Sequence, residues 1–331
     1  MATAILPRPA ATSAGELATI DQARAFAEAA QSPNTRKAYA SDLRDFRSFC
    51  RTREVSWLPA TPQTVALYVT DLAGCSKIAT IRRRLVAIIQ AHRERELDSP
   101  TSHEAVRRIV RGIARTNGTA QTKKAAVGVE QLRRMLLCTR GDDAKARRDR
   151  AMLLLGFAGA LRRSELAELD VTDLSWMRAG LKIAIRRSKT DQTGEGAEIP
   201  VPFVADRALC AARAVREWLD VAGITQGPVF RTFTLDHAVT DRRIDGRDVA
   251  NLVKRLALQA RLDGDFSGHS LRAGFVTAAA RSHVSLDRIA AVTRHRSLAI
   301  LSGYIRRANL FEDPALTSIV TPRAPKGATA A

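Results

Sequence analysis

Polar residues that can bind an anion or transfer a proton occur in the second half of the chain. Arg162 directly follows the strongly apolar run AMLLLGFAGAL at 151–161, and Glu165 comes three residues later. His269 and Arg272 stand three residues apart at an expected helix start. This spacing brings both side chains onto one face of the helix, near the positive end of its dipole. These residues therefore indicate a site that holds an anion.

Each of these signals also has an ordinary structural explanation. An arginine at the end of a buried helix often reaches water or neutralises the helix C-terminus. The pair of His269 and Arg272 fits a surface hydrogen bond equally well. Tyr304 follows His295 by nine residues in the apolar segment LAILSGYI, where a tyrosine usually belongs to the core. These residues indicate a functional site only when they are considered together and in this order.

The overall charge points to a polyanionic partner. The 331 residues include 53 Lys+Arg and 34 Asp+Glu, which gives a net charge of +19, and 45% of them are hydrophobic. This length suits about two domains, and the apolar content favours a globular protein over a disordered basic tail. Self-repulsion of this size opposes compactness unless a polyanion is nearby. Nucleic acid is the first candidate partner, and an anionic membrane is the second.

Other features argue against the membrane and against metal or nucleotide chemistry. No stretch approaches about 18 consecutive apolar residues, and the N-terminus lacks the pattern of a signal peptide. Four distant cysteines without a C-x-x-C pair are typical of reduced thiols in the cytoplasm; they are Cys50, Cys75, Cys138 and Cys210. The six histidines show no metal-ligand spacing, and no Gly-rich phosphate loop is present. We therefore expect a cytoplasmic nucleic-acid-binding protein with no metal and no cofactor.

The first half of the chain predicts a helical bundle. Residues 1–15 are rich in Ala, Pro, Thr and Ser and predict a flexible tail, and the helical pattern begins near Glu16. Apolar stripes recur at helical spacing within 35–51, after Thr61-Pro62 and after Ser76. In the helix after Ser76, Arg83 and Arg84 are predicted to face outward.

The next helix of this half has the clearest nucleic-acid signal. One stripe is apolar and the opposite stripe is entirely basic, with Arg107, Arg108, Arg111 and Arg115. A solvated face explains such a stripe, but solvated faces usually mix both signs of charge. Residues 101–150 contain 13 basic and 5 acidic side chains. This window therefore indicates a surface that contacts phosphates.

The second half predicts a mainly helical domain with a small β-sheet. The polar stretch at 117–126, which includes Lys123 and Lys124, is interpreted as a linker that adds to the basic surface. Two alternating segments, 181–187 and 197–203, flank a turn-rich loop and predict a β-hairpin. The expected helices are 129–139, 144–159, 163–169, 206–222, 247–262, 270–282, 285–293 and 297–306. The fold class is thus mainly α, with an N-terminal helical bundle at 16–116 and an α+β domain at 127–312 that together clamp DNA.

Taken together, these motifs resemble the tyrosine recombinase/integrase family. Arg162 lies in G-A-L-R-R-S-E-L, similar to the family's first arginine box, and Lys189 lies beside the predicted hairpin loop in R-R-S-K-T-D-Q. His269 to Arg272 fits the H-x-x-R box. His295 and Tyr304 stand at the second-histidine and tyrosine positions with the family's usual separation.

The resemblance covers about residues 30–312. The N-terminal helices look like the family's core-binding, SAM-like domain, and 127–312 looks like its catalytic domain, which leaves 313–331 as a C-terminal tail. The phrases S-K-T-D-Q, G-H-S-L-R-A-G and H-R-S-L-A resemble integrases of phages, plasmids and transposons. The family further implies a homotetramer on two double-stranded DNA sites. Residues 309–316 then pack either on a neighbouring protomer or on their own domain.

The resemblance also implies a metal-independent transesterification through a 3′-phosphotyrosyl link. Arg162, Arg272 and His295 would stabilise the negative charge on the non-bridging phosphate oxygens, because planar guanidiniums offer two parallel donors. Tyr304 would be the nucleophile, His269 its proton acceptor and Lys189 the acid for the leaving 5′-oxygen. Glu165 would orient Arg162 or His269 without touching the phosphate.

One position departs from the family pattern. Arg294 precedes His295, where the family usually has glycine. Two consequences are open: the extra cation contacts phosphate, or it shifts the start of the following helix and misplaces His295.

Three other functions compete with recombination. A non-catalytic DNA-binding regulator would explain the charge but not the combination of Tyr304, His295 and the H-x-x-R pair. A hydrolytic nuclease would need paired carboxylates and a metal, and no convincing carboxylate pair is present. An enzyme that relaxes supercoils through the same phosphotyrosine chemistry would share the site, because the outcome depends on assembly.

Overall fold

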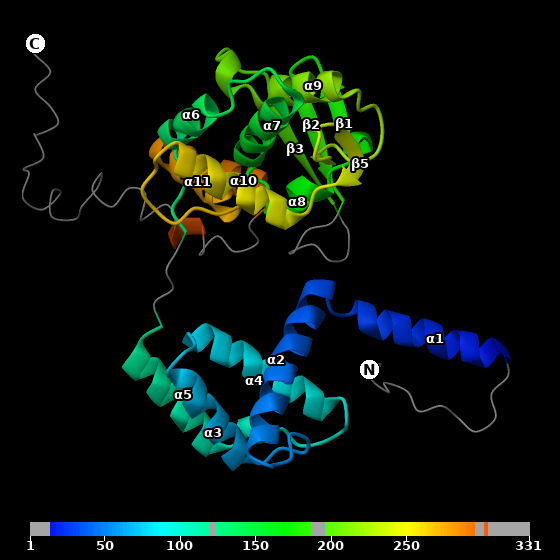
Figure 1. The fold of residues 1–331 in the computed structure, drawn as a ribbon, viewed down its shortest axis with the longest axis vertical. Helices are drawn as coiled ribbons and strands as arrows, with labels where there is room; N and C mark the ends of the chain where they lie inside the picture. Colours follow the sequence, from blue (N-terminus) through cyan, green and yellow to red (C-terminus); the bar gives the residue numbers. More distant parts are fainter. Residues whose placement is uncertain (1–13, 120–123, 187–195, 295–300, 304–331) are drawn as a thin grey trace, which may run out of the picture. The chain divides into compact units, whose positions relative to one another are not determined.

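The computed structural model describes residues 14–119, 124–186, 196–294 and 301–303. The chain divides into two compact units, Met1–Thr122 and Lys123–Ala331, and the division falls inside the predicted linker. Figure 1 draws the first unit from blue through cyan to blue-green and the second from green to orange. Within the described ranges, no helix is both long enough and apolar enough to cross a membrane.

The first unit consists of helices in its described residues (Figure 1). Local capping chemistry sets several helix starts. Thr61 accepts a hydrogen bond from the backbone N–H of Thr64 at 3.1 Å, and Pro62 occupies the first turn, so the predicted start at this point is confirmed. The helices are α1 (Ala14–Ala29), α2 (Pro33–Thr52), α3 (Pro62–Ala73), α4 (Ile78–Arg93) and α5 (Glu104–Asn117).

The predicted apolar stripes form the core of this unit. Phe46 of α2, Tyr68 of α3 and Ile81 of α4 are almost completely buried, and the rings of Phe46 and Tyr68 lie 4.9 Å apart. Val106 attaches α5 to the same cluster, with the rest of its apolar stripe partly buried against it. The basic stripe of α5 is consequently exposed, as the periodicity predicts.

The prediction that Arg84 faces outward is wrong. Its guanidinium donates to Asp45 and, at 3.1 Å, to the hydroxyl oxygen of Tyr68, and its side chain is only 18% exposed. Arg83 remains largely exposed and pairs with the buried carboxylate of Asp42 at 2.9 Å. Asp42, which is buried, and Asp45, which is exposed, both lie on α2 and pair with these arginines, a contact that the helical stripe of α4 alone does not reveal.

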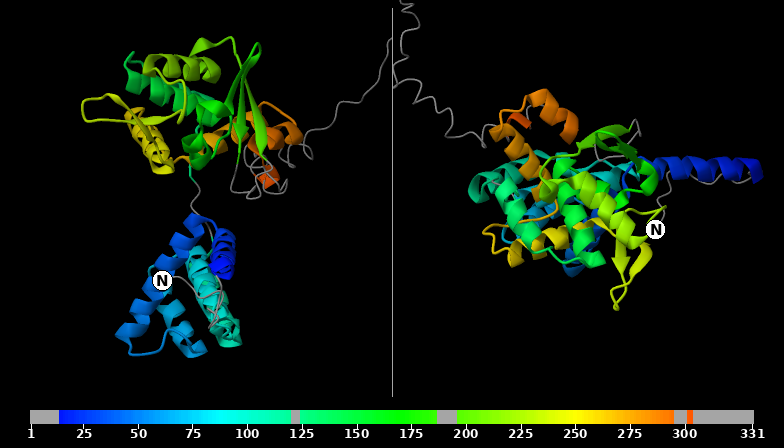
Figure 2. Two further views of the ribbon diagram at one scale, coloured as in Figure 1. Left: turned by 90° about the vertical axis from the view of Figure 1, so that its right-hand side faces the viewer. Right: turned by 90° about the horizontal axis from the view of Figure 1, so that it is seen from above.

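In its described residues, the second unit is mainly helical with two small antiparallel sheets (Figure 2). The predicted hairpin is present as β2 (Gly180–Ile185) and β3 (Ala197–Pro202), with Ile183 opposite Ile199. A third strand, β1 (Leu174–Met177), pairs with the other edge of β2. The helices are α6 (Val129–Leu137), α7 (Ala144–Ala158), α8 (Arg163–Glu168), α9 (Ala211–Ala222), α10 (Gly246–Gln259), α11 (His269–Arg281) and α12 (Leu286–Thr293).

The sequence prediction of a single small sheet is incomplete. It omits β1 and the separate hairpin of β4 (Arg231–Phe233) and β5 (Val239–Arg243). These strands are three to five residues long, too short to show a clear alternation. The predicted helix at 206–222 also begins later, at Ala211, after a short 3-10 turn.

In the core of this unit, α11 packs against α7 and against the segment around Val127 that precedes α6. Val127 is fully buried, and its N–H donates to the carbonyl of Ser270 at 3.0 Å. Gly274 makes this approach possible, because a Cβ at this position would lie 1.9 Å from the carbonyl oxygen of Val127. On α7, Gly156 similarly gives room to Leu271. These contacts hold the first two turns of α11 close to α7 and to Val127.

Candidate active site

The corner between α7 and α8 presents Arg162. Leu153–Leu155 of α7 is buried, Gly159 ends the helix, and Ala160 takes a left-handed conformation with φ of 45°. Arg162 then stands at the start of α8. Its backbone N–H donates to Oε2 of Glu165 at 2.8 Å, and its guanidinium donates to Oε1 at 2.5 Å. Glu165 therefore holds both the backbone and the side chain of Arg162.

Arg272 lies one helical turn into α11 and is only 2% exposed. One terminal nitrogen donates to the carbonyl of Ala160 at 2.8 Å, and the other donates to the carbonyl of Thr293. These two carbonyls come from the α7–α8 corner and from the end of α12. Arg272 thus fixes both segments to α11, and a buried guanidinium with this support is suited to rigid recognition of an anion.

His269 is the first residue of α11 and is exposed on the surface. Partial removal from water, together with the positive charges of Arg272 and Arg162, lowers the pKa of His269 below its ordinary value of 6.5. The ring is therefore neutral at pH 7 and can accept a proton. The same electrostatic interactions show that His269 shares its surroundings with both arginines.

Arg294 contributes a contact that the sequence prediction missed. It caps the end of α12, and its guanidinium donates to Oε2 of Glu165 at 2.6 Å. Burial opposes ionisation of Glu165, but the charge of Arg294 and the hydrogen bonds from Arg162 outweigh it, so the pKa of Glu165 is lowered. The missing glycine before His295 marked the position, but nothing local indicated a partner 129 residues away.

The structure brings three predicted site residues together: Arg162, His269 and Arg272. Glu165 binds Arg162, one of its two predicted partners. The predicted residues Lys189, His295 and Tyr304 lie outside the described residues. Of the helix predicted at 297–306, residues 301–303 are described and are helical.

The predicted DNA-contact residues of α5 and those of the linker have different surroundings. The arginines of α5 are exposed, and Arg111 pairs with Glu104 at the start of the same helix. Lys124 pairs with Asp265 of the second unit, and Lys123 lies outside the described residues. The exposed guanidiniums of α5 are thus the strongest candidates for phosphate contacts in the first unit.

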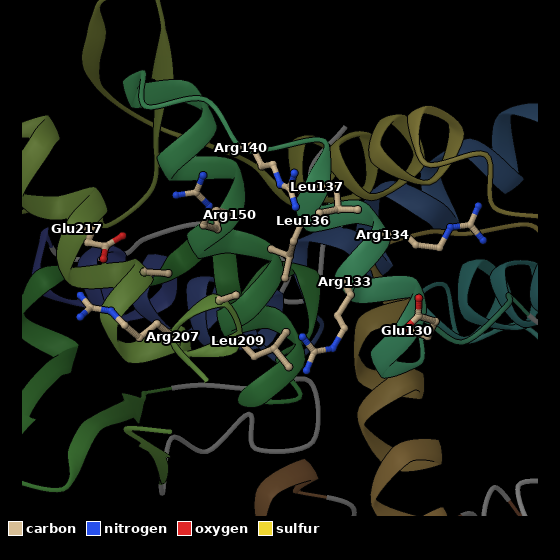
Figure 3. Close-up of a pocket in the computed structure, with 12 residues that line it drawn as sticks. Glu130, Arg133, Arg134, Leu136, Leu137, Arg140, Arg150, Arg207, Leu209 and Glu217 are labelled. Carbon is tan, nitrogen blue, oxygen red and sulfur yellow. The ribbon is translucent and has the colours of Figure 1, made fainter. Parts of the chain in front are cut away.

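A pocket of about 570 Å³ lies away from these residues, between α6, α7 and α9. Figure 3 shows Arg133, Arg140 and Arg207 around it, with Leu136 and Leu209 lining its apolar part. None of the predicted site residues lines this pocket. The described residues also hold no group of three or more His, Cys, Asp or Glu side chains arranged to bind a metal ion.

Two family models match this chain. The phage integrase family matches residues 127–310, and the phage integrase N-terminal SAM-like domain matches residues 24–95. An integrase/recombinase xerD homolog of Selenomonas ruminantium is 38% identical over 295 residues, which cover 87% of this chain and 86% of the relative. The chain belongs to the phage integrase family. It is a tyrosine site-specific recombinase, and the expected family and enzyme class are confirmed.

A further relative and two solved structures agree with this assignment. The tyrosine recombinase Synpcc7942_B2651 of Synechococcus elongatus is 29% identical over 292 residues, covering 83% of this chain and 85% of the relative. The XerH site-specific recombinase, solved in a post-cleavage complex with difH substrate, matches 94% of this chain and 85% of its own, with a TM-score of 0.63 and 16% identity. A lambda integrase dimer bound to a core site matches 83% and 72%, with a TM-score of 0.60 and 15% identity. The mainly α fold with a helical N-terminal part and an α+β catalytic part is therefore confirmed.

Proposed function

We propose that this recombinase cuts one DNA strand at a specific site with Tyr304 as the nucleophile. The phenolic oxygen attacks the scissile phosphorus, and the phenolic proton passes to His269. The bond from phosphorus to the 5′-oxygen breaks, and Lys189 protonates that oxygen. The products are a 3′-phosphotyrosyl link and a free 5′-hydroxyl. A 5′-hydroxyl from the partner DNA then attacks this link, which restores the phosphodiester and releases Tyr304.

The convergence of Arg162, His269 and Arg272 carries this proposal. The attack puts extra negative charge on the non-bridging oxygens, and preorganised donors that meet such charge commonly supply the largest share of catalysis. Arg272 is buried and held by carbonyls from two other segments, and Arg162 is held by Glu165. Both guanidiniums are therefore oriented before DNA arrives. A neutral His269 beside them suits the transfer of a proton from Tyr304.

The same proposal extends to the partners. The solved XerH and lambda integrase structures contain DNA, which supports double-stranded recombination sites as the partner of this chain. We propose that residues 16–116 and 127–312 form the two halves of a DNA clamp joined by the linker at 117–126. We further propose a homotetramer on two sites and a cytoplasmic location. The amino-acid sequences of the motifs support the proposal that this chain is an integrase of a mobile element.

The proposed chemistry is tested by trapping the covalent intermediate. A pool of nicked duplexes of random sequence is incubated with the full chain, and adducts that survive denaturing electrophoresis are sequenced. We expect an adduct on a narrow set of sequences, with a free 5′-hydroxyl at the cut. Tyr304→Phe should abolish the adduct, because it removes only the nucleophilic oxygen.

The matched control is another tyrosine of the same chain, Tyr39, which lies in α2 of the first unit. Tyr39→Phe should keep the adduct. Sequence-specific binding without an adduct from the wild-type chain would instead support a DNA-binding regulator. An adduct that persists in Tyr304→Phe would disprove the assignment of the nucleophile.

A further inference from the structure

Arg294 has the contacts of a functional side chain. Its side chain is only 10% exposed, and the carboxylate that it binds, Glu165, is 2% exposed. The guanidinium also donates to the carbonyl of Val292 at 2.9 Å. Its Nε is a buried donor with no hydrogen-bond partner within the part of the chain that the structure describes. Buried donors of this kind are rare in proteins.

The backbone of Arg294 adds to this unusual environment. Its φ of 54° and ψ of 43° lie in the left-handed region, which glycine adopts without the steric cost that an arginine incurs. The chain accepts this cost at the end of α12 and gains a guanidinium there. The ion pair with Glu165 connects α12 to α8, and Arg272 connects the preceding residue, Thr293, to α11.

The charges explain what the guanidinium does. Arg162 and Glu165 alone would form a buried pair with no net charge, and the carboxylate would attract the cation away from a phosphate. Arg294 binds the second oxygen of the same carboxylate, so the group of three side chains keeps one net positive charge. Because the pair of Arg162 and Glu165 is buried, solvent screens the additional positive charge of Arg294 only weakly.

We infer that Arg294 is a positioning residue for DNA cleavage, which shares Glu165 with Arg162 and thereby keeps the charge of Arg162 available to the scissile phosphate. The inference rests on the proposed function, in which Arg162 binds that phosphate. Arg294 acts through Glu165 and not through direct contact with DNA. It also anchors the end of α12 to the corner that carries Arg162.

A double-mutant cycle tests this mechanism. The variants are Arg294→Met, Glu165→Gln and the combination of both, and the rate measured is single-turnover adduct formation at saturating protein on a nicked duplex selected by the wild-type chain. Arg294→Met should slow cleavage by about tenfold or more, a size typical of coupling within one ion-pair network. In the Glu165→Gln background the same change should alter the rate by less than about threefold, because the carboxylate charge is already gone.

Two further measurements separate positioning from folding and from DNA affinity. Arg294→Lys keeps the charge and should recover most of the rate, whereas non-covalent DNA affinity should change by less than about threefold in all variants. Arg288 is an exposed arginine on α12, so Arg288→Met is the matched control and should cleave at the wild-type rate. If Arg294→Met does not fold, Arg294→Gln takes its place in the same cycle.

The outcomes distinguish the two proposals. No adduct from the wild-type chain on any duplex would refute the proposed function itself. A wild-type adduct with equal slowing by Arg294→Met in both backgrounds would overturn the inference, because Arg294 would then act independently of Glu165. An unchanged rate in Arg294→Met would overturn it as well.

Discussion

The contact between Gly274 and Val127 provides the most direct test of how the fold positions the site. In Gly274→Ala the new methyl group would lie 1.9 Å from the carbonyl oxygen of Val127 and 2.6 Å from its carbonyl carbon. Ordinary contacts to a Cβ exceed 3.0 Å, so the two segments must separate by at least about 1 Å. That separation disrupts the hydrogen bond from Val127 to Ser270.

The expected loss of stability follows from these contacts. Overpacking costs about 1–3 kcal/mol, and leaving the buried N–H and C=O without partners costs about 1–3 kcal/mol. The better helix propensity of alanine returns about 1 kcal/mol. The net loss is therefore about 1–5 kcal/mol, which lowers the Tm of a unit of this size by about 2–20 °C.

Calorimetry of the full chain measures this effect, and hydrogen exchange assigns each transition to its unit. Gly112 is the matched control: it lies in α5, and a Cβ there would meet nothing within 4 Å. Gly112→Ala should stabilise the first unit by about 0.5–1 kcal/mol. In Gly274→Ala, cleavage should also fall, because Ser270 lies between His269 and Arg272. An unchanged Tm in Gly274→Ala would refute the tight approach of α11 to Val127.

Three further predictions concern other parts of the molecule. Because the pKa of His269 is lowered, the rate of adduct formation should fall in acid with a midpoint below about pH 6.5, where His269 gains a proton. Measuring the rate against pH checks this, and a midpoint above about pH 7 would contradict the role of His269. Replacing Arg107, Arg111 and Arg115 by glutamine should reduce the slope of log K for DNA binding against log salt by up to about 2.7, at about 0.9 for each lost phosphate contact; an unchanged slope would exclude this face. His92 is fully buried, accepts a hydrogen bond from the N–H of Ala60 at 3.0 Å and donates one to the carbonyl of Ile88 at 2.9 Å. His92→Ala should therefore destabilise the first unit by about 2–4 kcal/mol in urea unfolding. A loss below about 1 kcal/mol would contradict this structural role.

The local features of the fold were predictable because neighbouring residues produce them. Thr61 and Pro62 start α3 through a side-chain cap and a fixed φ, which depend on three or four residues only. The apolar and basic stripes of α5 follow from helical periodicity alone. The short strands β1, β4 and β5 were missed, because strands of this length are stabilised by the segments that pair with them.

The chemistry of the site divides in the same way. The sequence by itself determined the family, the residue types and the strong positive charge, because motif spacing and composition are properties of the chain. Only the tertiary structure decided which charges are already paired: Arg84 turns toward Asp45, Arg272 holds two carbonyls, and Arg294 binds Glu165. The physical reason is that a buried charge needs a partner, and packing selects that partner from residues far apart in the chain. The proposed role of Arg294, the one departure visible in the sequence, thus depends on a contact that only folding creates.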